Sequence, residues 1–143
     1  MLRPASPTDL DAISALLEAS SLPTEGVVDH LASFVVFESD GKIRAAGGLE
    51  VYGKLALLRS LVVAQASRAR GVGGRICDRL EAAARERGVI EVFLLTETAA
   101  DFFVRRGYAT VDRGEAPAAI AKTREFSALC PESATLLRLK LAG

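Results

Sequence analysis

The sequence predicts an α/β fold of the mixed type, with a mostly antiparallel central sheet flanked by helices. Three observations carry this prediction. Strands in hairpins come first, a buried strand then leads through a glycine-rich loop into an amphipathic helix, and another buried strand follows. This order is typical of a sheet that combines hairpins with a strand–helix–strand unit.

The first helix is expected directly after a short strand at Leu2–Arg3. Ser6-Pro7-Thr8-Asp9 combines an N-cap serine, a proline at the first helical position and an acid at the third, which is a helix start signal. The helix should run to about Ala19, because residues 22–26 contain proline and glycine and end the periodic pattern. A short helix is expected at 27–31.

Two hairpins follow the first helix. Asp40-Gly41 is a hairpin turn signal, and Gly53-Lys54 predicts a second tight turn. Gly47-Gly48 indicates a bulge between these turns. The strand after the second turn is almost continuously apolar, which predicts a central strand buried on both faces. The expected strands are 33–38, 43–51 and 55–63.

The second half alternates helices and strands. Apolar residues recur every four positions from Val72 to Ala84, which predicts an amphipathic helix that Gly88 ends. The later elements are expected as a buried strand at 89–95, a helix capped by Thr98 that reaches Arg105, a strand at 108–112, a helix at 118–129 and a strand at 134–141.

The segment Arg68-Ala69-Arg70-Gly71-Val72-Gly73-Gly74 lies between the central strand and the amphipathic helix. Glycines allow turns that other residues resist, and they let a ligand approach the backbone. The first N–H groups of the helix lack intrahelical partners and point at such a ligand, with the positive end of the helix dipole behind them. The loop is therefore a candidate pyrophosphate site, although an ordinary turn with solvated arginines would have the same sequence.

Composition limits the partners of this loop. The chain has 143 residues, of which 50% are hydrophobic, enough for one domain with one core over residues 1–143. Lys and Arg together number 18, as do Asp and Glu, so no net field favours nucleic acid or a membrane. No signal peptide or membrane span is evident, and we expect a cytoplasmic protein. Cys77 and Cys130 lack the spacing of a metal site, and no metal is expected.

A dinucleotide-binding fold is the first alternative for a glycine-rich strand–helix turn. Such a domain normally begins with this turn and places an acid at the end of the next strand, about 20 residues on. Glu97 is a nominal match, but the hairpins before the loop argue against this fold.

Two blocks of sequence resemble the GNAT superfamily of N-acetyltransferases. Leu58-Arg59-Ser60-Leu61-Val62-Val63 followed by Arg68-x-x-Gly71-x-Gly73 resembles its acetyl-CoA motif, and residues 94–108 resemble its next strand and helix. The second block is similar to amino-acid acetyltransferases of the acetylglutamate-synthase type. Over nearly its whole length the chain resembles small GNAT proteins of bacterial arsenic-resistance operons.

The resemblance implies an acetyl-CoA-dependent N-acetyltransferase that acts on a small amino-acid-like amine and often forms a homodimer. It implies that the end of the central strand pairs with the pantetheine arm and that the glycine loop holds the pyrophosphate. The cofactor-binding residues implied are Leu61, Val62, Val63, Arg68, Arg70, Gly71, Val72, Gly73, Gly74, Phe102 and Phe103.

The chain departs from the family at both usual catalytic positions. Many members carry a glutamate base where Leu57 stands and a tyrosine acid where Phe103 stands. If Gly53-Lys54 form a two-residue turn, Glu50 falls opposite Leu57 on the same sheet face, and Arg59 lies diagonal to it. Without a general acid, the CoA thiolate can leave unprotonated and take a proton from water afterwards, because thiols have moderate pKa values.

We therefore interpret Glu50 as a catalytic base acting through water, or as an acceptor for the substrate ammonium. Arg59 is the candidate clamp for a substrate carboxylate, and Thr96 and Glu97 are candidate substrate-binding residues. The alternative for the first pair is a local ion pair with no catalytic duty. His30, the sole histidine, is interpreted as a surface or lid residue.

Two other function classes stay open. The absent tyrosine and shifted glutamate are compatible with a non-catalytic acyl-CoA-binding sensor. An arsenical-binding protein using Cys77 and Cys130 is the weakest alternative, because soft-metal sites need clustered thiolates.

Overall fold

A computed structural model describes residues 1–68, 70–129 and 131–141. Across these residues the strands form one seven-stranded sheet in the order β1-β2-β3-β4-β5-β7-β6. β4 and β5 are parallel, whereas β1–β2, β2–β3, β5–β7 and β6–β7 are antiparallel, which confirms the predicted mixed sheet. The strands are β1 Leu2–Pro4, β2 Phe34–Ser39, β3 Lys42–Tyr52, β4 Leu55–Val63, β5 Glu91–Thr96, β6 Ala109–Val111 and β7 Thr135–Lys140.

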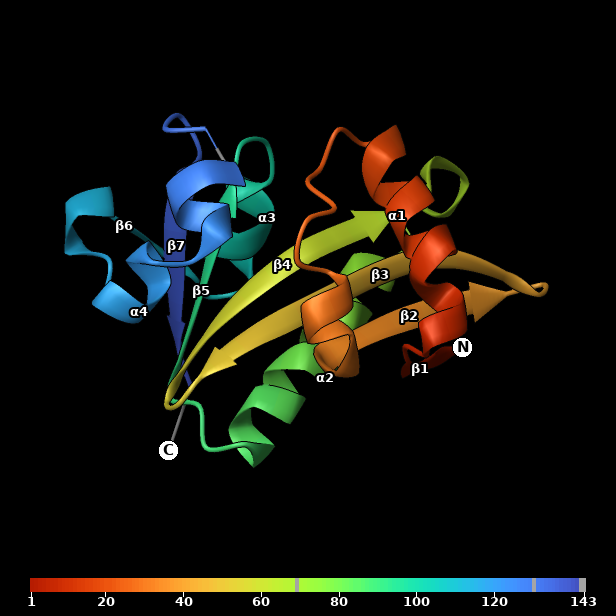
Figure 1. Ribbon diagram of the computed structural model, residues 1–143, viewed down its shortest axis with the longest axis horizontal. Helices are drawn as coiled ribbons and strands as arrows, with labels where there is room; N and C mark the ends of the chain where they lie inside the picture. Colours follow the sequence, from red (N-terminus) through yellow and green to blue (C-terminus); the bar gives the residue numbers. More distant parts are fainter. Residues whose placement is uncertain (69, 130, 142–143) are drawn as a thin grey trace. The chain divides into compact units, whose positions relative to one another are not determined.

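Helices and short helical turns connect these strands (Figure 1). The α-helices are α1 Leu10–Ala19, α2 Val72–Glu86, α3 Ala100–Arg105 and α4 Ala118–Ala121. The shorter segments are the 3-10 turns η1 Pro7–Asp9, η2 Val28–Ser33, η3 Gln65–Ser67 and η4 Arg113–Glu115, and the π-helical turn η5 Glu125–Leu129.

The chain divides into two compact units. The first unit comprises Met1–Glu50 and Leu58–Ala83, and the second comprises Val51–Leu57 and the chain from Ala84 onward. The single domain expected over residues 1–143 stays a prediction.

In the first unit, α1 and α2 cover opposite faces of the sheet. Ile13 and Leu17 of α1 are fully buried in a cluster with Ala46 of β3 and Val62 of β4. A Cβ added to Gly47, the next residue of β3, would lie 2.8 Å from Ile76 Cγ2 of α2. Because successive residues of a strand point to opposite faces, Ala46 faces α1 and residue 47 faces α2.

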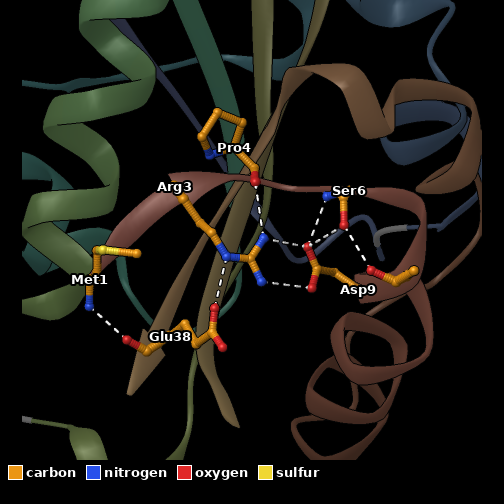
Figure 2. Close-up of polar contacts among 7 residues, drawn as sticks. Met1, Arg3, Pro4, Ser6, Asp9 and Glu38 are labelled. Atoms are coloured by element: carbon orange, nitrogen blue, oxygen red, sulfur yellow. Dashed lines mark hydrogen bonds and ion pairs between the residues drawn. The ribbon is translucent and has the colours of Figure 1, made fainter. Parts of the chain in front are cut away.

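A polar network fastens the N-terminal strand to its neighbours (Figure 2). The Arg3 guanidinium donates to both Asp9 carboxylate oxygens, at 2.7 and 2.9 Å, and to Glu38 Oε1 at 2.8 Å. The Ser6 backbone N–H donates to Asp9 Oδ2 at 2.8 Å, as the predicted capping signal requires. The hydrogen bonds from Arg3 lead the contributions that lower the pKa of Asp9 from 3.8 to about 2.

In the second unit, α4 and η5 cover one face of the strands. Leu57 of β4, Phe93 of β5, Ile120 of α4 and Leu136 of β7 form its buried cluster, with Phe126 of η5 packed against them. β7 pairs with β5 along six residues and with β6 along three, so it forms the middle of this part of the sheet.

Three local predictions are wrong. Gly47 and Gly48 pair in regular register with Val35 and Phe34, and the shift lies at Phe37/Glu38 instead. Gly48 has no side chain because the Phe34 ring occupies the space that a Cβ would need.

The other two errors concern helices. Thr98 does not cap α3; Ala99 is the N-cap residue, and its N–H donates to Thr96 Oγ1 at 3.0 Å. The helix expected at 118–129 is two short segments, because Thr123 accepts hydrogen bonds at the break between them.

No helix in the described ranges is both long enough and apolar enough to span a bilayer.

Candidate active site

Two buried charges of opposite sign meet in the first unit. Glu50 lies near the end of β3 and Arg59 in the middle of β4, and each is 4% exposed. Arg59 Nη1 donates to Glu50 Oε2 at 2.7 Å. The strands that carry them are joined by the two-residue turn Gly53-Lys54, as predicted. The structure thus confirms that the Glu50 and Arg59 side chains lie together, as expected for two strands joined by a two-residue turn.

Two further hydrogen bonds hold Arg59. Its Nη2 donates to the Glu25 carbonyl at 2.6 Å and its Nε to Ser60 Oγ at 3.0 Å. Gly26, at φ +83°, allows this approach, since a Cβ there would lie 2.8 Å from Arg59 Nη1. The arginine side chain is 2% exposed and its donors point to protein atoms. This geometry fits the ion-pair interpretation of Arg59 and makes it a support for Glu50.

His30 also reaches this pair. It lies in η2, and its Nε2 is 3.7 Å from Glu50 Oε1. The imidazole is 30% exposed, whereas the glutamate side chain is 5% exposed. Sequence reasoning placed His30 on a lid and missed this contact, because residues 30 and 50 belong to segments with no local pairing signal.

Ser60 has an unusual backbone conformation next to the ion pair. Its φ of +60° is a left-handed conformation, which is uncommon for a residue other than glycine and lies here within a strand. The hydroxyl of this strained residue accepts the hydrogen bond from Arg59 Nε. Val62, two residues on, is buried in the cluster that α1 forms with the sheet.

The glycine loop precedes α2, as predicted. Gly71 has φ +75° and no atom within 4 Å of an added Cβ, so open space adjoins this glycine. α2 begins at Val72, and the Arg75 N–H donates to the Gly71 carbonyl at 3.1 Å. A helix start with an open glycine before it fits a pyrophosphate group. Gly73 and Gly74 lie in the first turn of α2.

The two loop arginines are exposed. Arg68 Nε donates to the Val63 carbonyl at 3.0 Å, and its Nη2 to Ser20 Oγ at 3.4 Å. These bonds place Arg68 over the end of β4, where the resemblance puts the cofactor. Ala69, between the arginines, lies outside the described residues.

Four predicted site residues belong to the second unit. Thr96 and Glu97 follow one another at the end of β5, where Glu97 is exposed and Thr96 Oγ1 is bonded to Ala99 N. In α3, Phe103 is buried, with its ring 5.0 Å from the Phe102 ring and 5.3 Å from the Tyr108 ring. Tyr108 is 3% exposed, and its ring packs against Phe103.

Only one of the two cysteines of the arsenical-binding alternative lies within the described part of the chain. Cys77 is fully buried in α2, and Cys130 lies outside the described residues. Within the described ranges, no three or more His, Cys, Asp and Glu side chains gather in a way that could hold a metal ion.

The sequence has relatives among acetyltransferases. It is 32% identical over 120 residues to an uncharacterised N-acetyltransferase of Chlorobaculum tepidum. This alignment covers 78% of this chain and 77% of that protein. It is 33% identical over 122 residues to an amino-acid acetyltransferase of Ralstonia nicotianae. This alignment covers 78% of this chain and 27% of that longer protein.

Solved structures share the fold. The N-acetylglutamate synthase of Neisseria gonorrhoeae, in complex with coenzyme A and N-acetyl-glutamate, aligns with a TM-score of 0.86 at 22% identity. This alignment covers 100% of the chain and 35% of the synthase, so the chain spans about a third of that protein. A Mycobacterium tuberculosis protein solved with CoA aligns with a TM-score of 0.85 at 24% identity over 99% of both chains.

The family match covers more than half of the sequence. Residues 30–110 match the acetyltransferase (GNAT) domain, a range that contains His30, the Glu50–Arg59 pair and the glycine loop. The chain therefore belongs to the GNAT acetyltransferases, which use acetyl-CoA as their co-substrate.

Proposed function

We propose that this protein is an N-acetyltransferase that transfers the acetyl group of acetyl-CoA directly to a small amino-acid-like amine. The observation that carries the proposal is the buried Glu50–Arg59 pair on β3 and β4, in the same compact unit as the glycine loop. The amino-acid acceptor is supported by the relative described as an amino-acid acetyltransferase and by the fold shared with an N-acetylglutamate synthase.

The donor would be held by the loop and the end of β4. Acetyl-CoA supplies the acetyl group as an activated thioester. Backbone N–H groups at the start of α2 would bind the pyrophosphate, with Arg68 and Arg70 adding charge. Leu61, Val62 and Val63 would present backbone groups to the pantetheine arm, with Gly71, Val72, Gly73 and Gly74 around the phosphates. Phe102 and Phe103, in the second unit, are proposed as cofactor-binding residues on the resemblance.

Glu50 would act on the acceptor. An amine attacks only when it is neutral, so the ammonium must first lose a proton. Glu50 is an acceptor for that ammonium, or for its proton through a water molecule. Arg59 fixes one carboxylate oxygen, and so would orient the other, Oε1. Since Arg59 is almost fully buried, we propose that it positions Glu50. Thr96 and Glu97 are proposed as substrate-binding residues.

The leaving group would need no tyrosine. The family's usual acid position holds Phe103, which is packed between Phe102 and Tyr108 and carries no proton to give. A thiol is acidic enough for its thiolate to leave and take a proton afterwards from water or from the new amide nitrogen.

The test is thiol release from acetyl-CoA across a panel of amino acids and simple amines, with the acetylated product identified by mass spectrometry. Turnover is expected with at least one α-amino acid. Glu50→Gln should lower kcat/KM by about 100-fold, the usual contribution of a positioned acid or base. CoA affinity, measured by calorimetry, should change little, because the loop is untouched.

The matched control is Glu81→Gln, which changes a buried glutamate of α2 in the same unit. This variant should keep wild-type turnover. Equal loss in both variants would point to general destabilisation and would remove Glu50 from the chemistry. Tight CoA binding with no turnover on any amine would instead support the non-catalytic acyl-CoA sensor.

Three finer predictions stay open: a link to arsenic resistance and a homodimer, which rest on the resemblance, and a cytoplasmic location, which rests on the sequence pattern. We retain them as proposals.

A further inference from the structure

We propose that His30 takes the proton from the acceptor amine and passes it to solvent, with Glu50 holding the ring in place. The inference rests on the proposed function and assigns the two roles left open for Glu50. Glu50 remains the acceptor that attracts the ammonium, and the proton goes to His30. The contact that carries it is His30 Nε2 to Glu50 Oε1 at 3.7 Å.

Glu50 is poorly suited to keep a proton itself. Its Oε2 accepts a 2.7 Å hydrogen bond from Arg59, whose side chain is 2% exposed. Protonation of the carboxylate would leave that buried guanidinium without its counter-charge, which is unfavourable in a site from which water is largely excluded. Glu50 therefore serves better as the fixed partner of Arg59 than as the group that carries the proton away.

His30 has the properties that Glu50 lacks. Histidine changes its charge near neutral pH, so its ring can take up a proton and release it within one turnover. Its side chain is 30% exposed, which gives the proton a way out to water. The Glu50 carboxylate beside it stabilises the imidazolium, as a buried carboxylate does in an acid–histidine pair.

The charged groups around His30 agree with these separate roles for His30 and Glu50. Glu50 approaches the ring from β3, and Arg59 lies behind Glu50 on β4. On its own element, His30 is preceded by the exposed Asp29. The backbone carbonyl of Glu25, in the segment before η2, binds the Arg59 guanidinium and closes the far side of the pair.

The proton balance is complete. In the proposed neutral tautomer the proton on Nε2 faces Glu50, and Nδ1 takes the proton of the ammonium. The ammonium N–H bond breaks, its electron pair stays on nitrogen, and Nδ1 forms the new N–H bond. The neutral amine attacks the thioester carbonyl, and the carbon–sulfur bond breaks with its electron pair on sulfur. The second nitrogen proton goes to that thiolate, while the imidazolium returns its proton to water.

The experiment combines pH profiles with rescue. His30→Gln should lower kcat by about 100-fold and abolish the acidic limb of kcat/KM between about pH 5.5 and 9, while CoA affinity stays within about twofold. His30→Ala should regain part of its activity when free imidazole is added. An acidic limb that persists in His30→Gln, or an absence of imidazole rescue, overturns the inference.

A second readout needs no turnover. Because His30 is the only histidine, nitrogen-15 NMR reports its tautomer without assignment. The neutral ring should carry its proton on Nε2 in the wild type and lose this preference in Glu50→Gln. An unchanged tautomer mixture in Glu50→Gln overturns the pairing of ring and carboxylate.

Asp29→Asn is the matched control, since it changes an exposed residue of the same turn and should leave the profile unchanged. The two proposals fail differently. Wild-type protein that turns over no amine defeats the proposed function and this inference with it. Turnover with an unaltered acidic limb in His30→Gln defeats the inference alone.

Discussion

At the residue scale, Gly26 permits the contact on which the site depends. Its φ of +83° is disfavoured for residues with a side chain, and an added Cβ would lie 2.8 Å from Arg59 Nη1. Gly26→Ala should destabilise the protein by about 2 kcal/mol, from backbone strain together with the displaced guanidinium. Because Glu50 then loses its support, kcat/KM should fall at least about tenfold. Urea unfolding and steady-state kinetics measure both effects.

Gly41→Ala is the matched control for this variant. Gly41 has φ +73°, but no atom lies within 4 Å of an added Cβ, so the substitution adds strain without a clash. It should cost about 1 kcal/mol and leave activity intact. If both variants lost activity equally, the Gly26–Arg59 contact would have no special role.

The contacts of Glu50 show what a sequence can and cannot reveal about a site. Its meeting with Arg59 was predictable because a two-residue turn fixes which residues of a hairpin face each other. Its meeting with His30 was not, because η2 reaches β3 through tertiary packing, and no turn or periodicity encodes that approach. The glycine loop was predictable because its glycines and the helix that follows are adjacent in the chain.

At the scale of elements, the Arg3–Asp9–Glu38 network links β1, η1 and β2 (Figure 2). The pKa of Asp9 in the folded protein is about 2, below its ordinary value of 3.8. The stabilisation is therefore fully present above about pH 4 and is lost as the pH falls through about 2. With solvent screening allowed for, Asp9→Asn should remove about 1–2 kcal/mol at pH 6.

The measurement is the free energy of unfolding of wild type and Asp9→Asn between pH 6 and pH 2. The difference between the two proteins should shrink toward the acid end. Asp11→Asn, at an exposed acid in the first turn of α1, serves as the control with little effect. A difference that stays constant down to pH 2 would show that folding does not lower the pKa of Asp9.

Elements were predicted well where local chemistry decides them. β4 and the start of α2 were placed correctly because an apolar run and a glycine loop mark their boundaries. The helix at 118–129 was predicted as continuous because its composition is helical, but Thr123 bonds to neighbouring backbone groups and divides it. The pair Gly47-Gly48 was misread because glycine in a strand marks either a bulge or a close neighbour, and only the packed structure shows Phe34.

At the scale of the whole molecule, the two compact units raise the question of whether they unfold together. Ile13 and Ile120 are both fully buried, one in the cluster of each unit. Ile13→Ala and Ile120→Ala should each destabilise by about 2–5 kcal/mol, the usual range for a buried isoleucine. If residues 1–143 form a single domain, each variant should shift one common unfolding transition, seen by circular dichroism and fluorescence alike.

Two separate transitions, each moved by only one of the variants, would contradict the single-domain prediction. The fold class itself was predictable at this scale, since the order of hairpins, glycine loop and helix admits few topologies. The division into two units could not be predicted, because it depends on how contacts are distributed in the folded chain. No sequence signal for a linker marks it.

The left-handed backbone of Ser60 also bears on how β4 can be engineered. Side chains of a regular strand alternate between faces, so position parity normally tells a designer which face a residue occupies. A left-handed residue within a strand interrupts that alternation. A library that randomised every second position from Leu55 to Val63, to sample one face of the sheet, would therefore sample both. The face that each position of β4 occupies should be assigned separately for the residues before and after residue 60.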